Sequence, residues 1–234
     1  MGCFSGNVAH VGNTRIFARA TGSGTQYLVY QMEYAADDDL ALILPLPTPP
    51  NSSADAVRWI DLSTYPQFFQ DLANGFPLGE TAPQHAPKMS RVGSFDASFV
   101  PTRADFARLD ARFRIDDAVW DQLPEYHDYG FAVIQLRADA QTVHPIAFEF
   151  PTRDPNWLFF PTVHIHNAQA PGDVYFDHDL FCQARVGWMR SYDNAQAFMK
   201  IPAAQNIVAP DKRVERLTVR GMHPNSDIVL ELTA

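Results

Sequence analysis

The sequence predicts an α+β protein that is mainly β, with a large antiparallel sheet or sandwich and short helices inserted between roughly residues 53 and 123. Three observations support this fold class. Eighteen prolines among 234 residues leave little room for long helices. Short runs of β-branched and aromatic residues recur on both sides of the expected insert. The connections between the later runs are short, which favours antiparallel pairing of neighbouring strands.

The first strands are expected before the insert. Residues 27–32 (YLVYQM) are rich in strand-forming residues and follow a Gly-Ser-Gly turn signal. Residues 40–44 (LALIL) are apolar throughout and are followed by Pro45, which predicts a short strand buried on both faces. Residues 45–54 contain four prolines and two serines and are expected to form an extended, exposed loop.

Helical spacing of apolar residues occurs in the middle of the chain. In residues 65–72, three apolar side chains fall on one face of a helix. Further short helices are expected over residues 53–62 and within residues 103–123, where Asp and Thr residues are suited to cap them.

Strand signals dominate again from residue 129 onward. Strands are expected over residues 131–136, 146–150, 157–160, 162–166 and 174–183. A closing hairpin is expected over residues 214–219 and 228–232. Because strand-like segments lie on both sides of the proline-rich loop, residues 1–234 are expected to form a single domain.

The charge of the chain argues against two classes of partner. The net charge is −9, which disfavours binding to nucleic acid and to an anionic membrane surface. No apolar run approaches the ~20 residues that a membrane-spanning helix needs. The first residues show no secretion signal, so a cytoplasmic location is expected. In that compartment Cys3 and Cys182 would be reduced thiols.

Four side chains that can ligate a transition metal fall within nineteen residues: His164, His166, His178 and Cys182. His164 and His166 are two residues apart, so on a strand their imidazoles point to the same face and can meet one ion. Transition metals prefer such nitrogen and sulfur donors.

The other two ligands depend on how the chain returns. A Pro-Gly turn signal at residues 171–172 predicts a reversal, and an even pairing register would bring His178 beside the first two imidazoles. An odd register would bring Asp177 instead. Cys182 is four residues of strand beyond His178, roughly 13 Å, so it joins the site only through a bulge.

The leading hypothesis is therefore a soluble metal-binding protein, with a metal-dependent enzyme as one form of it. Zinc, copper, iron and manganese all suit a histidine-based site on a hairpin. In an enzyme, the ion would activate water or dioxygen for a small-molecule substrate at an unfilled coordination position.

Two alternatives belong to other functional classes. Cys3 could be the nucleophile of an N-terminal-cysteine amidohydrolase, provided that processing removes both Met1 and Gly2. The chain could instead be a metal-free binding or assembly module with an aromatic-rich surface. The motifs of nucleophile-elbow hydrolases, dinucleotide-binding domains and P-loop proteins do not occur.

Overall fold

A computed structural model describes residues 2–77, 96–138 and 141–232, and it confirms the mainly β fold class. The largest sheet contains β2 (His10–Ala20), β3 (Thr25–Ala35), β5 (Arg58–Ile60), β8 (Gln141–Thr142), β9 (Ile146–Pro151), β11 (Asp173–Cys182), β12 (Met189–Arg190) and β13 (Glu215–Pro224). A second sheet contains β1 (Cys3–Phe4), β4 (Leu40–Leu46), β6 (Ala97–Val100) and β7 (Gly130–Leu136). Two further strands, β10 (Trp157–Phe160) and β14 (Ile228–Glu231), pair with each other.

The helices are short. They are α1 (Phe68–Asn74) and α2 (Asp117–Trp120), with 3₁₀ turns at Arg103–Arg108, Ala111–Phe113, Pro124–Tyr126, Ala195–Ala197 and Ile201–Ala204. None of the helices in the described part of the chain is long and apolar enough to cross a membrane.

The strand order of the large sheet is β12-β13-β11-β2-β3-β9-β5, with β8 attached to β3. Its pairings are antiparallel except that of β11 with β2, which is parallel and aligns His178 with Thr14. The second sheet has the order β1-β4-β7-β6 and is antiparallel. The pairing of β2 with β11 therefore joins segments that are more than 150 residues apart in the sequence.

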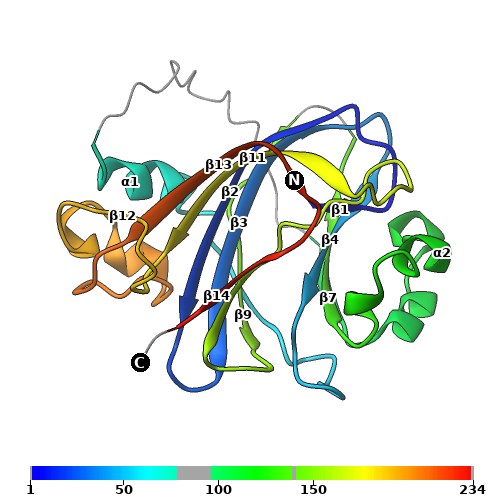
Figure 1. Ribbon diagram of the computed structural model, residues 1–234, viewed down its shortest axis with the longest axis horizontal. Helices are drawn as coiled ribbons and strands as arrows, with labels where there is room; N and C mark the ends of the chain where they lie inside the picture. The colour runs from blue at the N-terminus through cyan, green and yellow to red at the C-terminus, as the bar shows by residue number, and fades with distance from the viewer. Residues whose placement is uncertain (1, 78–95, 139–140, 233–234) are drawn as a thin grey trace.

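The two main sheets face each other across a shared core, and helical segments cover their outer sides (Figure 1). Alternation along each strand sorts the side chains between these layers. In β3, Leu28 and Tyr30 face the shared core with Leu42 of β4, whereas Val29 faces α1. In β4, Ile43 faces the outer layer that contains α2. β3 and β4 thus each contact two apolar layers.

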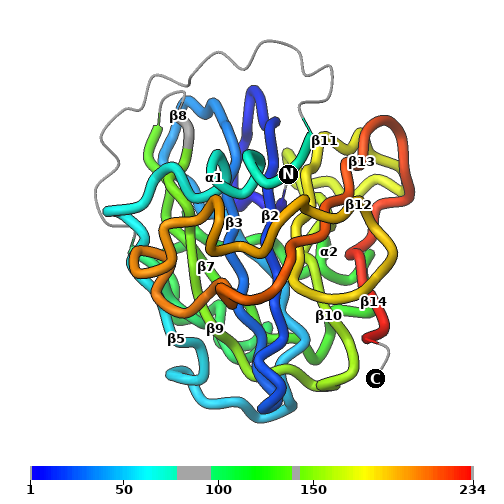
Figure 2. The backbone as a smooth tube through the Cα atoms, turned by 90° about the vertical axis from the view of Figure 1, so that its left-hand side faces the viewer, coloured from blue at the N-terminus to red at the C-terminus, as the bar shows by residue number. Residues whose placement is uncertain are grey.

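The outer face of the large sheet carries α1 and the chain that follows β12. Figure 2 looks onto this face and shows both segments in front of β2 and β3. The expected apolar face of the helix over residues 65–72 is present, and Phe68 packs edge-on against Phe17 of β2 at 5.8 Å between ring centroids. Phe69 contacts Phe181 of β11 at 6.0 Å.

Two expected local structures are wrong. The helix expected over residues 53–62 is replaced by the edge strand β5, because Trp59 packs against Phe148 of β9 at 5.2 Å and Arg58 pairs with Glu149. Pro45 does not end the strand before it, since β4 continues to Leu46.

Pairing between sequence neighbours is also not as expected. The strands expected near residues 131–136, 146–150, 157–160 and 174–183 all occur, as β7, β9, β10 and β11. β7 and β10 lie in the two other sheets, and β2 and β3 separate β9 from β11 in the large sheet, so these strands do not pair with one another. The expected closing hairpin does not form either, because β13 pairs with β11 and β14 pairs with β10.

Candidate functional site

The N-terminal strand β1 lies between β4 and the segment around Ile165. Its Cys3 and Phe4 pair with β4 on one side. On the other side, the Phe4 N–H donates to the Ile165 carbonyl oxygen at 2.9 Å, and the Ile165 N–H donates to the Gly2 carbonyl oxygen at 3.3 Å. Cys3 is 0% exposed and Phe4 is 1% exposed. The first residues described are thus part of the core of the molecule.

The turn between β13 and β14 holds the segment that contacts β1. The carboxylate of Asp227 accepts hydrogen bonds from the backbone N–H groups of Thr162 and Val163 at 2.7 and 2.8 Å. The Asn225 amide both accepts from the His164 N–H and donates to the His164 carbonyl oxygen, at 2.7 and 2.8 Å. Along residues 162–164, hydrogen bonds from these side chains therefore take the place of the backbone bonds that a neighbouring strand would make. For this reason the strand expected over residues 162–166 is not a regular one.

Asp227 contacts the residues around β1, although no sequence motif predicts this role. Burial raises the pKa of its carboxyl group to about 7, although the two backbone N–H donors and Tyr126 act in the opposite direction. The only sequence signal is Asn225-Ser226-Asp227, a run of residues that commonly bond to nearby backbone in turns. Nothing in that signal indicates which distant segment the turn will bind.

The structure brings His164, His166 and His178 together as an imidazole stack. The ring of His164 lies 5.6 Å from that of His166 and 5.4 Å from that of His178, with interplanar angles of 9° and 14°. The nitrogen lone pairs of imidazole lie in the ring plane. Among the described residues, however, these three side chains do not form a group that could hold one metal ion. The stack therefore packs the rings without directing their nitrogens to one centre.

Burial keeps the imidazole stack uncharged. It lowers the pKa of His164 to about 2 and that of His166 to about 4, and it lowers the pKa of His178 further. The Nε2 atoms of His164 and His166 have no hydrogen-bond partner among the described residues. The stack is completed by Phe176, whose ring lies 5.0 Å from His164 and 4.7 Å from His178.

Cys182 lies apart from the imidazole stack. β11 keeps a continuous register from Asp173 to Cys182, so no bulge shortens the four residues between His178 and Cys182. The thiol is buried, and burial raises its pKa to about 12. Cys182 is thus a core residue in the interface between the sheets.

These positions overturn the metal-binding hypothesis. Within residues 2–77, 96–138 and 141–232, no group of three or more His, Cys, Asp or Glu side chains is arranged to hold a metal ion. His164, His166 and His178 are close but stacked, and Cys182 is remote from them. The H-x-H spacing correctly predicted that the imidazoles of His164 and His166 lie close together, but proximity alone does not make a metal site.

The amidohydrolase alternative is also wrong. Cys3 forms part of a strand with partners on both sides, and its Sγ lies 3.8 Å from the Val163 carbonyl oxygen. Burial raises the pKa of the thiol well above its ordinary value, so the nucleophilic thiolate is disfavoured. Cys3 and Cys182 are both free thiols and belong to different apolar clusters.

Comparison with known proteins identifies the fold but no sequence family. No family model and no curated protein sequence matches the chain. Among solved structures, baculovirus P35 is similar with a TM-score of 0.56 and 12% sequence identity, over 97% of this chain and 98% of that chain.

Two further P35 structures show the same likeness. A mutated baculovirus P35 after caspase cleavage has a TM-score of 0.53 at 12% identity, over 94% of this chain and 99% of that chain. The caspase-8/P35 complex has a TM-score of 0.52 at 12% identity, over 94% and 96%. The chain therefore has a P35-like fold along nearly its whole length.

Proposed function

We propose that this chain binds a caspase or a caspase-like cysteine peptidase. The observation that carries the proposal is the P35-like fold, which extends over nearly the full length of both chains. P35 has been solved both after cleavage by a caspase and in complex with caspase-8. The same arrangement of sheets and flanking helices supports a similar partner for this chain.

The proposed partner is a protein, and this replaces the small-molecule substrate expected from the sequence. A chain that a caspase cleaves must enter the active site of that caspase. We therefore expect binding of this chain to compete with peptide substrates of its partner. In such a complex the catalytic residues belong to the peptidase, and this chain changes the activity of its partner by binding it.

A cytoplasmic location fits the proposal. Cys3 and Cys182 are both buried and unbridged. Free thiols are typical of proteins in reducing compartments. Fractionation of cells that express a tagged chain, with markers for cytosol and secreted material, tests this location directly.

The proposed function is tested with the purified chain and a panel of purified caspases. Size-exclusion chromatography with light scattering is expected to reveal a complex with at least one caspase, and that caspase is expected to lose activity toward a fluorogenic peptide. Intact-mass spectrometry of the mixture reports whether the chain is cut and where.

A caspase whose catalytic cysteine is replaced by alanine serves as the matched control. It separates simple docking from capture that requires the nucleophile. If the chain forms no complex with any caspase in the panel and leaves every activity unchanged, the proposed function is wrong.

A further inference from the structure

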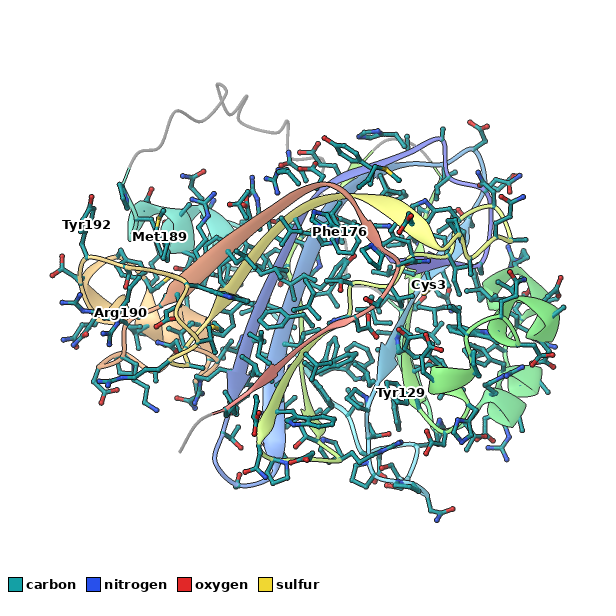
Figure 3. All side chains as sticks on the ribbon, in the orientation of Figure 1. Cys3, Tyr129, Phe176, Met189, Arg190 and Tyr192 are labelled. Carbon is teal, nitrogen blue, oxygen red and sulfur yellow. The ribbon has the colours of Figure 1, made fainter. Side chains whose placement is uncertain are left out.

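Residues 184–214 form a segment that packs on the outer face of the large sheet, called here the basic lobe. Figure 3 shows Met189, Arg190 and Tyr192 of this lobe at one end of the long axis, well away from Cys3 and Tyr129. β12 lies in this lobe and is the terminal strand of the large sheet. The lobe thus lies at one end of the molecule, away from the residues that surround β1.

The basic lobe has the opposite charge to the rest of the chain. It contains five of the 18 cationic residues but only two of the 27 acidic ones. The cations are Arg185, Arg190, Lys200, Lys212 and Arg213, and all five are exposed. The remainder of the chain holds 13 cations and 25 acids. An acidic protein therefore presents one positively charged end.

The cations of the basic lobe are not neutralised within the molecule. None of the five forms an ion pair with a carboxylate in the described part of the chain. Outside the lobe, seven arginines do form such pairs: Arg58, Arg103, Arg108, Arg112, Arg153, Arg216 and Arg220. The positive charge of the lobe is available to a partner.

Large apolar side chains lie among these charges. Met189 is 58% exposed and Tyr192 is 62% exposed, on either side of Arg190. Tyrosine, methionine and arginine are enriched in protein–protein interfaces, and tyrosine and arginine are the frequent energetic centres of such surfaces. The residue types therefore suit a protein partner.

The exposed residues are held on a fixed backbone. The Ser191 N–H donates to the Val214 carbonyl oxygen at 2.8 Å, and the Tyr192 N–H donates to the Gly75 carbonyl oxygen at the end of α1 at 2.9 Å. Beneath them, Glu215 accepts from the N–H groups of Val186 and Trp188. A surface that is already ordered loses little conformational entropy on binding.

The outer edge of β12 adds backbone groups to this surface. Met189 and Arg190 pair with Arg216 and Glu215, and the bond from Ser191 to Val214 fixes the alternation of the ladder. In an antiparallel ladder, the N–H and C=O of Arg190 then point away from β13. An extended segment of a partner can pair with such an edge.

From these observations we infer that the basic lobe is a docking surface for an acidic face of the caspase partner. Arg185, Arg190 and Lys212 attract that face electrostatically, and Tyr192 with Met189 supplies the apolar contact. This inference rests on the proposed function. The basic lobe is a second contact area in the proposed complex, and it increases the rate and the strength of association.

The charge of the lobe is tested by a triple variant, Arg185→Glu/Arg190→Glu/Lys212→Glu. Its association rate constant with the caspase that the wild-type chain binds is measured by stopped-flow fluorescence in about 50 mM salt. We expect a decrease of about tenfold or more, which shrinks toward about twofold at ~0.5 M salt because screening removes the steering.

A control variant, Arg108→Glu/Arg112→Glu/Arg137→Glu, changes the net charge by the same amount on exposed residues outside the lobe. Thermal melts establish that both variants are folded. If the two triple variants associate equally slowly, the effect is one of overall charge and the inference is wrong. If both associate at the wild-type rate, the lobe is not used and the inference is also wrong.

The apolar contact is tested with Tyr192→Ala. We expect binding to weaken by about 30-fold, mainly through faster dissociation, as for a tyrosine at the centre of an interface. Tyr175→Ala is the matched control, because Tyr175 is 57% exposed but lies on β11. Equal effects of the two substitutions would contradict the assignment.

Two further results would overturn the inference in distinguishable ways. If the wild-type chain binds no caspase, the proposed function fails and the inference fails with it. If the wild-type chain binds caspase and both lobe variants bind as it does, the function holds and the inference alone fails. Sedimentation with phosphatidylserine vesicles tests a membrane as the partner instead. If the wild-type chain binds the vesicles and the triple variant of the lobe does not, the lobe is a membrane-binding surface and the inference is wrong.

Discussion

Two buried imidazoles, one half-buried imidazole and one carboxyl group lie around the N-terminal strand, and loss of contact with water favours the uncharged form of each. The pKa of His164 is lowered to about 2 and that of His166 to about 4, and the pKa of His178 is lowered as well. Asp227 is affected in the opposite sense, since burial raises the pKa of its carboxyl group to about 7. These single residues make the stability of the protein depend on pH.

We expect the free energy of unfolding to decrease as the pH falls from about 6.5 to 4.5. In this range the unfolded chain protonates three imidazoles that stay neutral in the native state, while the native state holds one extra proton on Asp227. The unfolded state therefore binds about two more protons, which corresponds to a loss of about 2–3 kcal/mol per pH unit. Urea denaturation at several pH values measures this slope.

His166→Gln is expected to remove about one of the extra protons that the unfolded state binds, and so to make the pH dependence of the free energy of unfolding less steep. His127→Gln is the control, because His127 is an exposed residue that the stack does not contact. A stability that stays constant from pH 6.5 to 4.5 would show that the stack titrates in the native state.

The two thiols are expected to be unreactive in the native protein. Cys3 and Cys182 are both 0% exposed, and burial raises the pKa of each. Modification by a disulfide reagent should therefore require unfolding, and denaturation in urea should release two reactive thiols. Rapid labelling of Cys3 in native buffer would instead mean that β1 leaves its place between β4 and Ile165.

At the scale of elements, the turn between β13 and β14 uses its side chains to hold distant segments of the chain together. Asp227 and Asn225 bind the backbone of residues 162–164, and that segment binds β1. Three segments that are distant in sequence are joined by these bonds. The loss of one side chain in the turn therefore affects the placement of the N-terminal strand.

Asp227→Ala is expected to destabilise the protein by about 2–4 kcal/mol, because two buried N–H groups lose their acceptor. Asp227→Asn should cost only about 1 kcal/mol or less at pH 6, since the amide oxygen can accept the same bonds and the native carboxyl group is largely neutral at that pH. Chemical denaturation compares the two variants with Asp211→Ala, a change on an exposed turn. Equal losses for Ala and Asn would contradict this role of the side chain.

At the scale of the whole molecule, the sheets share one core and are expected to unfold together. The apolar cluster between them draws residues from β2, β3, β4, β7, β9 and β11. Scanning calorimetry should give a single transition in which the calorimetric and van't Hoff enthalpies agree. Two separated transitions would show that the predicted single domain is two units.

The sequence predicted strands better than it predicted their partners. Residues 157–160 and 131–136 were recognisable because a strand with alternating or continuous apolar residues leaves a local pattern. The parallel pairing of His178 with Thr14 leaves none, since it joins residues far apart in the chain. The imidazole stack shows the same limit: spacing placed His164 and His166 together, but the packing of His164 against Phe176 and His178 joins residues from another segment of the chain.

The parallel pairing of β2 with β11 has a consequence for how the protein is made. β2 and β3 can form a hairpin as soon as they are synthesised, but β2 receives its second neighbour only after residue 182 has been added. At about 5–20 residues per second, that interval lasts about 10–30 s on a ribosome. Until then the hairpin exposes an unpaired edge, and the high sequence separation of this contact slows folding further. Nascent chains of this fold are therefore expected to depend on chaperones until the second half of the large sheet is complete.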